Sequence, residues 1–146
     1  MTLKQTDYAY GRKQQAVGYA HGTVCAAVFE FEFNEDFTAA SDVIELGFLP
    51  GGAQVIRASL IGEGMGATTA DVGLLDGTAG EDDESRSLTA DLLFGGVSVD
   101  DNEADADRLT CLGIAKSDDH RGIGATVGAD ISAGSAKLTV VVEYIF

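Results

Sequence analysis

The last eleven residues, 136–146, alternate between apolar and mixed positions with a period of two. One set of side chains is wholly apolar: Ala136, Leu138, Val140, Val142, Tyr144 and Phe146. The other set includes Lys137, Thr139 and Glu143. Because successive side chains of a strand point to opposite faces, this pattern predicts a β-strand with one buried face.

Similar segments recur along the chain, and glycine-rich turns separate them. The strand candidates are 24–33, 43–49, 53–61, 69–75, 109–115, 123–131 and 136–146; the segment 87–99 fits either a strand or one helical turn. No stretch of about 12 residues keeps a helical period. The sequence therefore predicts an all-β domain of about eight strands, an antiparallel two-sheet β-sandwich that is jelly-roll-like.

Two of these segments carry more specific expectations. In the first, Phe29, Phe31 and Phe33 alternate with Glu30 and Glu32, which predicts a strand with one wet face. In the second, the apolar side chains Ile44, Leu46 and Phe48 alternate with Glu45 and Gly47. This alternation also predicts a strand.

The N-terminal residues differ from the rest of the chain. Residues 1–22 show no period and contain three basic residues and one acidic residue, a net charge of +2, so the remainder carries −17 of the total of −15. We expect an extended arm over 1–22 and a β-sandwich domain over 23–146. Tyrosine and arginine are enriched at protein–protein interfaces, so the partner-binding candidates of the arm are Tyr8, Tyr10, Arg12, Lys13 and Tyr19. The alternative is a frayed terminus.

The charge and hydropathy pattern limit the partners. A net charge of −15 argues against nucleic acid, because phosphate binding needs clustered Lys and Arg. No apolar stretch approaches the roughly 18 to 20 residues of a membrane helix, and the first residues lack the apolar region of a signal peptide. We therefore expect neither a nucleic-acid nor a membrane partner.

Catalytic and cofactor motifs are lacking. No serine lies in a Gly-x-Ser-x-Gly elbow, and His120 stands beside carboxylates in a turn, where adjacent side chains rarely aim at one point. The Cys and His residues are too scattered for a zinc site. The acidic loops 81–84 and 100–107 could bind calcium but lack the EF-hand order, so solvated loops are the favoured interpretation. We expect no enzyme activity, no metal and no cofactor.

Two cysteines, Cys25 and Cys111, lie in apolar segments. They could form a disulfide between neighbouring strands. The favoured alternative is a pair of buried free thiols that act as small apolar side chains.

Several segments carry a resemblance to a known class. The block 42–61, D-V-I-E-L-G-F-L-P-G-G-A-Q-V-I-R-A-S-L-I, is followed by D-V-G-L at 71–74, and G-A-D-I at 128–131 precedes the terminal K-L-T-V-V-V-E-Y-I-F. Together they resemble virion structural proteins of tailed bacteriophages, of the capsid decoration (cement) or head-fibre type.

The resemblance implies a jelly-roll-like domain on the outer surface of the phage head. It further implies the major capsid protein as partner, a homo-oligomer, often a trimer, synthesis in the host cytoplasm, a final location in the virion and no enzyme activity. A strongly acidic body would suit this place, because like charges keep particles apart. The alternative function is a receptor- or glycan-binding β-sandwich of a fibre or tail.

Overall fold

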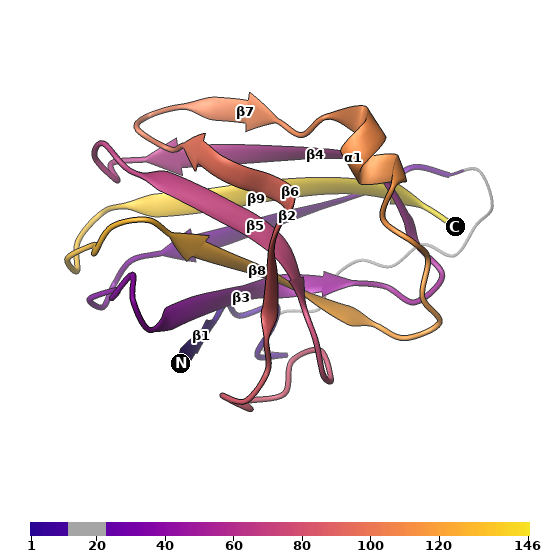
Figure 1. Ribbon diagram of the computed structural model, residues 1–146, viewed down its shortest axis with the longest axis horizontal. Helices are drawn as coiled ribbons and strands as arrows, with labels where there is room; N and C mark the ends of the chain where they lie inside the picture. The colour runs from indigo at the N-terminus through magenta and orange to yellow at the C-terminus, as the bar shows by residue number, and fades with distance from the viewer. Residues whose placement is uncertain (12–22) are drawn as a thin grey trace.

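The computed structural model describes residues 1–11 and 23–146, which form a sandwich of two β-sheets (Figure 1). One sheet has five strands in the order β1-β3-β8-β5-β6, and the other has four in the order β2-β9-β4-β7. The strands are β1 (Thr2–Gln5), β2 (Cys25–Glu32), β3 (Asp42–Leu49), β4 (Gln54–Glu63), β5 (Thr69–Leu75), β6 (Leu88–Ser98), β7 (Glu103–Asp105), β8 (Arg121–Val127) and β9 (Lys137–Ile145). The prediction of an all-β protein is confirmed.

The core lies between the two sheets. Strand β9 is central in its sheet, and its side chains Leu138, Val140 and Val142 are completely buried, as the sequence pattern predicted. Phe29 and Phe33 of the β2 segment enter the same core. Burying a side chain of this size contributes about 1.5–3 kcal/mol, so this apolar layer dominates the stability of the fold.

Strand β3 departs from simple alternation through a β-bulge. Glu45 pairs with Gly124 and Gly47 pairs with Ile123, which leaves the residue between them without a partner. The extra residue reverses the parity of the strand, so Leu49 is buried whereas Phe48 is only half-buried. Strict alternation with Ile44 and Leu46 would place Phe48 in the core, and the bulge prevents this.

The predicted strand 109–115 is also wrong, because this segment contains the short helix α1 (Arg108–Leu112). Asp107 caps the helix, its side chain accepting a hydrogen bond from the Leu109 N–H at 3.3 Å, and Gly113 ends it. A capping carboxylate at one end and a glycine at the other favour a helical turn over an isolated strand. Within the predicted acidic loop 100–107, three residues form β7.

The first residues of the chain belong to the sandwich. Strand β1 pairs in parallel with β3, Thr2 opposite Asp42 and Gln5 opposite Glu45. Residues 2–5 are thus part of a sheet and not of an extended arm. Residues 12–22 lie outside the described residues, so the division at residue 22 stays a prediction.

The ambiguous segment 87–99 forms a strand, β6, which pairs with β5 and closes the far edge of the five-stranded sheet. The candidate 123–131 is shorter than expected: β8 ends at Val127, and Ile131 makes an isolated bridge to Phe37.

Within the residues described, no helix has the length and apolar character needed to cross a membrane.

Candidate interaction surface

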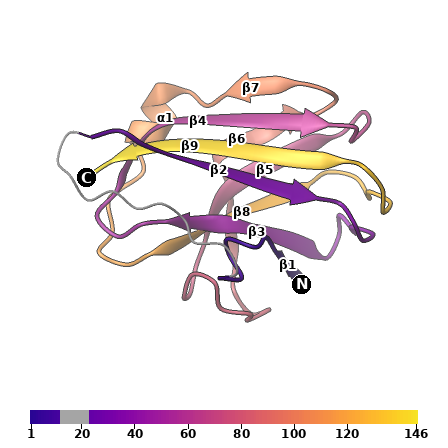
Figure 2. The ribbon, with the colours of Figure 1, turned by 180° about the vertical axis from the view of Figure 1, so that it is seen from behind.

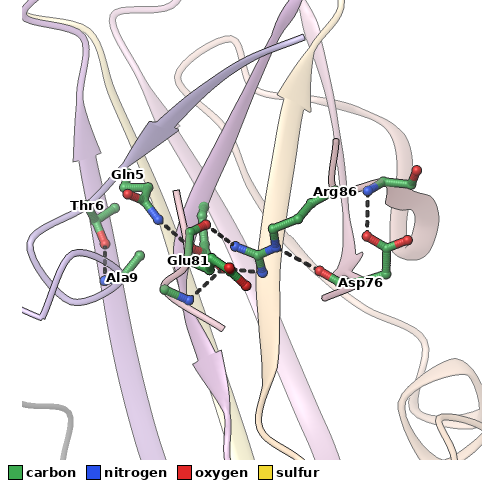
Figure 3. A network of polar contacts seen from close by, with 9 residues as sticks. Gln5, Thr6, Ala9, Asp76, Glu81 and Arg86 are labelled. Atoms are coloured by element: carbon green, nitrogen blue, oxygen red, sulfur yellow. Dashed lines mark hydrogen bonds and ion pairs between the residues drawn. The ribbon is translucent and has the colours of Figure 1, made fainter. Parts of the chain in front are cut away.

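A buried ion pair organises one side of the molecule. The Arg86 guanidinium donates from Nη2 to Glu45 Oε2 at 2.7 Å, and both side chains are almost fully buried, with 2% and 0% exposed. The remaining guanidinium nitrogens are also used: Nε donates to the Asp76 carbonyl at 2.7 Å and Nη1 to the Glu81 carbonyl at 2.9 Å (Figure 3). A buried charge is tolerated only with such complete pairing.

The carboxylate of Glu45 binds two further segments. Its Oε1 accepts a hydrogen bond from Gln5 Nε2 at 2.7 Å, and Oε2 accepts one from the Gly80 N–H at 3.3 Å. We call this group of residues the Glu45 cluster: Gln5, Glu45, Asp76, Gly80, Glu81 and Arg86. It joins β1, β3 and the loop 76–87. Glu45 alternates with apolar residues in the sequence but is buried, because Arg86 supplies a buried partner of opposite charge.

Gly122 of β8 makes room for this pair. A Cβ atom at that position would lie 2.3 Å from Glu45 Oε2 and 2.7 Å from Arg86 Nη2. Both distances are far below van der Waals contact. Any side chain larger than that of glycine at this position would therefore displace the Glu45–Arg86 ion pair. Nothing in the local sequence indicates this arrangement, because Glu45 alternates with apolar residues as a surface residue would.

The loop 76–87 has its own local order next to the cluster. Asp83 accepts hydrogen bonds from the Ser85 hydroxyl at 2.7 Å and from the Ser85 N–H at 2.9 Å. These hydrogen bonds, the hydroxyl first, hold the pKa of Asp83 below its ordinary value. The predicted acidic loop 81–84 is therefore ordered by local hydrogen bonds, and its Glu81 carbonyl binds Arg86 of the Glu45 cluster.

A groove of about 920 Å³ opens between the edge strands of the two sheets. Figure 2 shows these strands, β1 and β2, on the same side of the molecule. We call it the β1–β2 groove; its lining consists of residues 2–8, Val28, residues 30–32, Asn34 and Glu35. Four carboxylates and one ammonium group line it, namely Asp7, Glu30, Glu32 and Glu35 against Lys4. Its electrostatic character is acidic.

The predicted partner-binding residues divide into two groups. Tyr8 is half-buried, and its ring packs edge-on against Phe29 with the centroids 5.7 Å apart, so it also supports the core. Tyr10 is 57% exposed. The structure brings these two tyrosines to one short turn after β1. Arg12, Lys13 and Tyr19 lie outside the described residues, and their role in binding stays a prediction.

Large apolar side chains are exposed at two other places. Val24 and Val28 are 55% and 49% exposed on or beside β2, and Leu109 and Leu112 of α1 are 78% and 51% exposed. Sequence reasoning missed the exposure of the two leucines, because it assigned them to a strand. The cap at Asp107 was the signal that could have identified the helix.

His120 does not form a catalytic group with its neighbours. Its Nδ1 accepts a hydrogen bond from the Gly51 N–H at 2.8 Å, and its ring packs on Phe48 with the centroids 4.9 Å apart. His120 therefore connects the turn after β3 with the start of β8 through one hydrogen bond and one ring contact.

The acidic loop 100–107 is used in local structure. Asp101 accepts from the Gly64 N–H at 2.8 Å, Asp105 accepts from the Ser59 hydroxyl at 2.6 Å, and Asp107 caps α1. Across residues 1–11 and 23–146, no group of three or more His, Cys, Asp or Glu side chains could hold a metal ion.

Cys25 and Cys111 are not joined by a disulfide, so the disulfide alternative is wrong. Cys25 is half-buried and Cys111 is fully buried on α1. Burial raises the pKa of the Cys111 thiol above its ordinary value, because the thiolate would lose its hydration.

The comparisons with known proteins point to one class. No family model matches the sequence, and no curated protein matches it. Among solved structures, a chain from the capsid of Ralstonia phage GP4 is similar over 98% of this chain and 97% of its own, with a TM-score of 0.83 and 28% identity.

Two further capsid structures share the fold. A chain of the acidic stable capsid of the Helicobacter pylori bacteriophage KHP30 has a TM-score of 0.55 and 19% identity, over 87% of this chain and 90% of its own. A chain of the cyanophage Pam1 capsid has a TM-score of 0.58 and 18% identity, over 92% and 93%. This protein is thus similar to chains of phage capsids, which supports a structural role in the virion. Nothing in the described residues indicates catalysis.

Proposed function

We propose that this protein is a capsid decoration protein, which binds the outer surface of a phage head and stabilises the capsid lattice. The observation that carries the proposal is the likeness to a chain of the GP4 capsid along nearly the whole length of both chains. A jelly-roll-like sandwich, attachment to the major capsid protein and a trimer on the lattice belong to the same proposal. A protein that binds the assembled shell and not its free subunits stabilises the shell by linkage.

The charge of the chain supports an outward-facing place. Residues 23–146 carry −17, and such a charge keeps particles apart by repulsion. The basic residues Arg12 and Lys13 and the exposed ring of Tyr10 lie close together in the sequence, where a contact with an acidic or polar neighbour would use them.

The first experiment measures copy number by quantitative mass spectrometry of purified virions. A decoration protein is present in numbers comparable to the major capsid protein. A low copy number would instead support the alternative, a receptor- or glycan-binding component of a fibre or tail. A protein absent from the particles would exclude both.

The second experiment measures binding to heads that lack the protein. Deleting residues 1–22 is unsuitable, because the deletion would also remove β1. The double variant Arg12→Glu and Lys13→Glu tests the arm. The double variant Arg108→Glu and Lys116→Glu, at exposed positions elsewhere, changes the net charge by the same amount and is the control. We expect saturable binding of the parent protein, weakened in the arm variant and unchanged in the control. Equal binding of all three would remove the arm from the proposal.

A further inference from the structure

One wall of the β1–β2 groove is the outer edge of β2, which pairs with no strand formed by residues 1–11 and 23–146. The Phe33 N–H donates to the Ala136 carbonyl at 3.0 Å, and the antiparallel register continues with Phe31 opposite Leu138 and Phe29 opposite Val140. In an antiparallel ladder, alternate residues face the same neighbour. The backbone groups of Val28 and Glu30 therefore point away from β9, toward the groove, and within residues 1–11 and 23–146 no strand pairs with them.

The opposite wall is the outer edge of β1. The Thr2 N–H donates to the Ser41 carbonyl at 2.8 Å and the Thr6 N–H to the Glu45 carbonyl at 3.0 Å. The alternation of a parallel ladder then directs the backbone groups of Leu3 and Gln5 away from β3. Two edge strands thus border the same groove, and unpaired edges are natural sites for strand addition.

The side chains of the groove specify the chemistry of the added strand. Glu30 and Glu32 are exposed on the outer face of β2, whereas Phe31 and Leu3 are half-buried inside the groove. Glu32 and Asp7 have no ion-pair partner among the described residues, and Glu30 meets Lys137 only at 3.8 Å. A strand beside β2 would place alternate side chains next to these carboxylates and the others over the apolar residues.

We propose that an extended segment of the neighbouring capsid polypeptide, alternating Lys or Arg with apolar residues, adds to the free edge of β2 in the β1–β2 groove. This inference rests on the proposed decoration function and adds to it the site and the kind of partner segment. Backbone hydrogen bonds to Val28 and Glu30 hold the segment, and its basic side chains face Glu30 and Glu32. The edge from Val28 to Glu32 accommodates about five residues, or roughly 16 Å of strand.

The test compares two proline variants of one sheet. Glu30→Pro removes an N–H that points into the groove. Glu103→Pro is the matched control on β7, the other edge strand of the same sheet. The Gly62 N–H donates to the Asn102 carbonyl and the Ala106 N–H to the Ala58 carbonyl. In this register the Glu103 N–H points away from β4. Both glutamates are exposed, and proline is tolerated at outward positions of edge strands. Circular dichroism verifies that each variant is folded.

The variants are titrated onto phage heads that lack the protein. We expect Glu30→Pro to weaken binding about tenfold or more and Glu103→Pro to leave it within about twofold. Hydrogen exchange of the parent protein, bound and free, gives a readout that does not depend on a variant. Bound protein should exchange more slowly over residues 25–32.

The outcomes separate the two proposals. If the parent protein binds heads, while Glu30→Pro binds equally well and residues 25–32 gain no protection, the strand-addition proposal is overturned and the decoration function stands. If the parent protein does not bind heads at all, the decoration function fails, and the proposed partner segment with it.

Discussion

The Glu45 cluster permits a direct test of how the fold is held together. Replacing Glu45 with Gln keeps the size of the side chain and removes its charge. The Arg86 guanidinium, only 2% exposed, would then have no charged partner. The amide group of the new residue can accept from Gln5 or from Arg86 through its one oxygen, whereas the carboxylate now accepts with both.

The expected magnitude follows from the burial of both groups. Breaking a fully buried ion pair by removing one charge costs about 3–5 kcal/mol. The total free energy of unfolding of a domain is about 5–15 kcal/mol, so this variant should lose a large part of it. For a chain of this size the loss corresponds to a decrease in Tm of about 10 °C.

Urea unfolding, followed by circular dichroism, measures the change in the free energy of unfolding. Glu30→Gln is the control, because Glu30 is 53% exposed and its Lys137 partner lies at 3.8 Å, so that pair contributes about 1 kcal/mol or less. The double variant Glu45→Gln with Arg86→Met removes both charges and should recover much of the loss. A Glu45→Gln protein as stable as the Glu30→Gln control would refute this account of the cluster.

Three further predictions concern packing and accessibility. Gly122→Ala should destabilise the protein by about 1–3 kcal/mol in the same assay, because its Cβ would clash with the ion pair, whereas Gly134→Ala, with no atom nearer than 3.8 Å, should change little. A thiol reagent should modify half-buried Cys25 quickly, and fully buried Cys111 with its raised pKa only as the protein unfolds; fast modification of both in the folded protein would contradict the burial. Tyr8→Ala should lower the urea midpoint through the lost ring contact with β2, a loss of about 1–3 kcal/mol, and an unchanged midpoint would exclude that role.

The sequence predicted the strands whose side chains alternate without interruption. Strand β9 is the clearest case, since its inner face is apolar at every position from Leu138 to Tyr144. Periodicity succeeds there because one face meets the core and the other does not. It fails at Phe48, because the bulge in β3 inserts a residue that has no local signature.

The features that sequence reasoning missed depend on contacts between distant residues. Glu45 and Arg86 are 41 positions apart, and neither position shows that the other lies beside it. The parallel pairing of β1 with β3 is similar, because the polar sequence Thr-Leu-Lys-Gln has no alternation of its own and joins the sheet through β3. The helix α1 differs, since its end signals Asp107 and Gly113 are local in the sequence, and only the apolar pattern of the segment was used to predict a strand.

The same cluster explains why so short a strand as β1 can form one wall of the groove. Four residues paired to a single neighbour would fray in isolation. Gln5 donates to Glu45 Oε1, while Arg86 and Gly80 donate to Oε2, so one carboxylate connects β1 with the loop 76–87 through β3. An apolar pair of equal volume could supply as much stability, but it would not bind the side chain of Gln5. We infer that the buried charges are suited to fix the position of β1, and with it the shape of the β1–β2 groove, at the side of the sandwich where the partner segment is proposed to add.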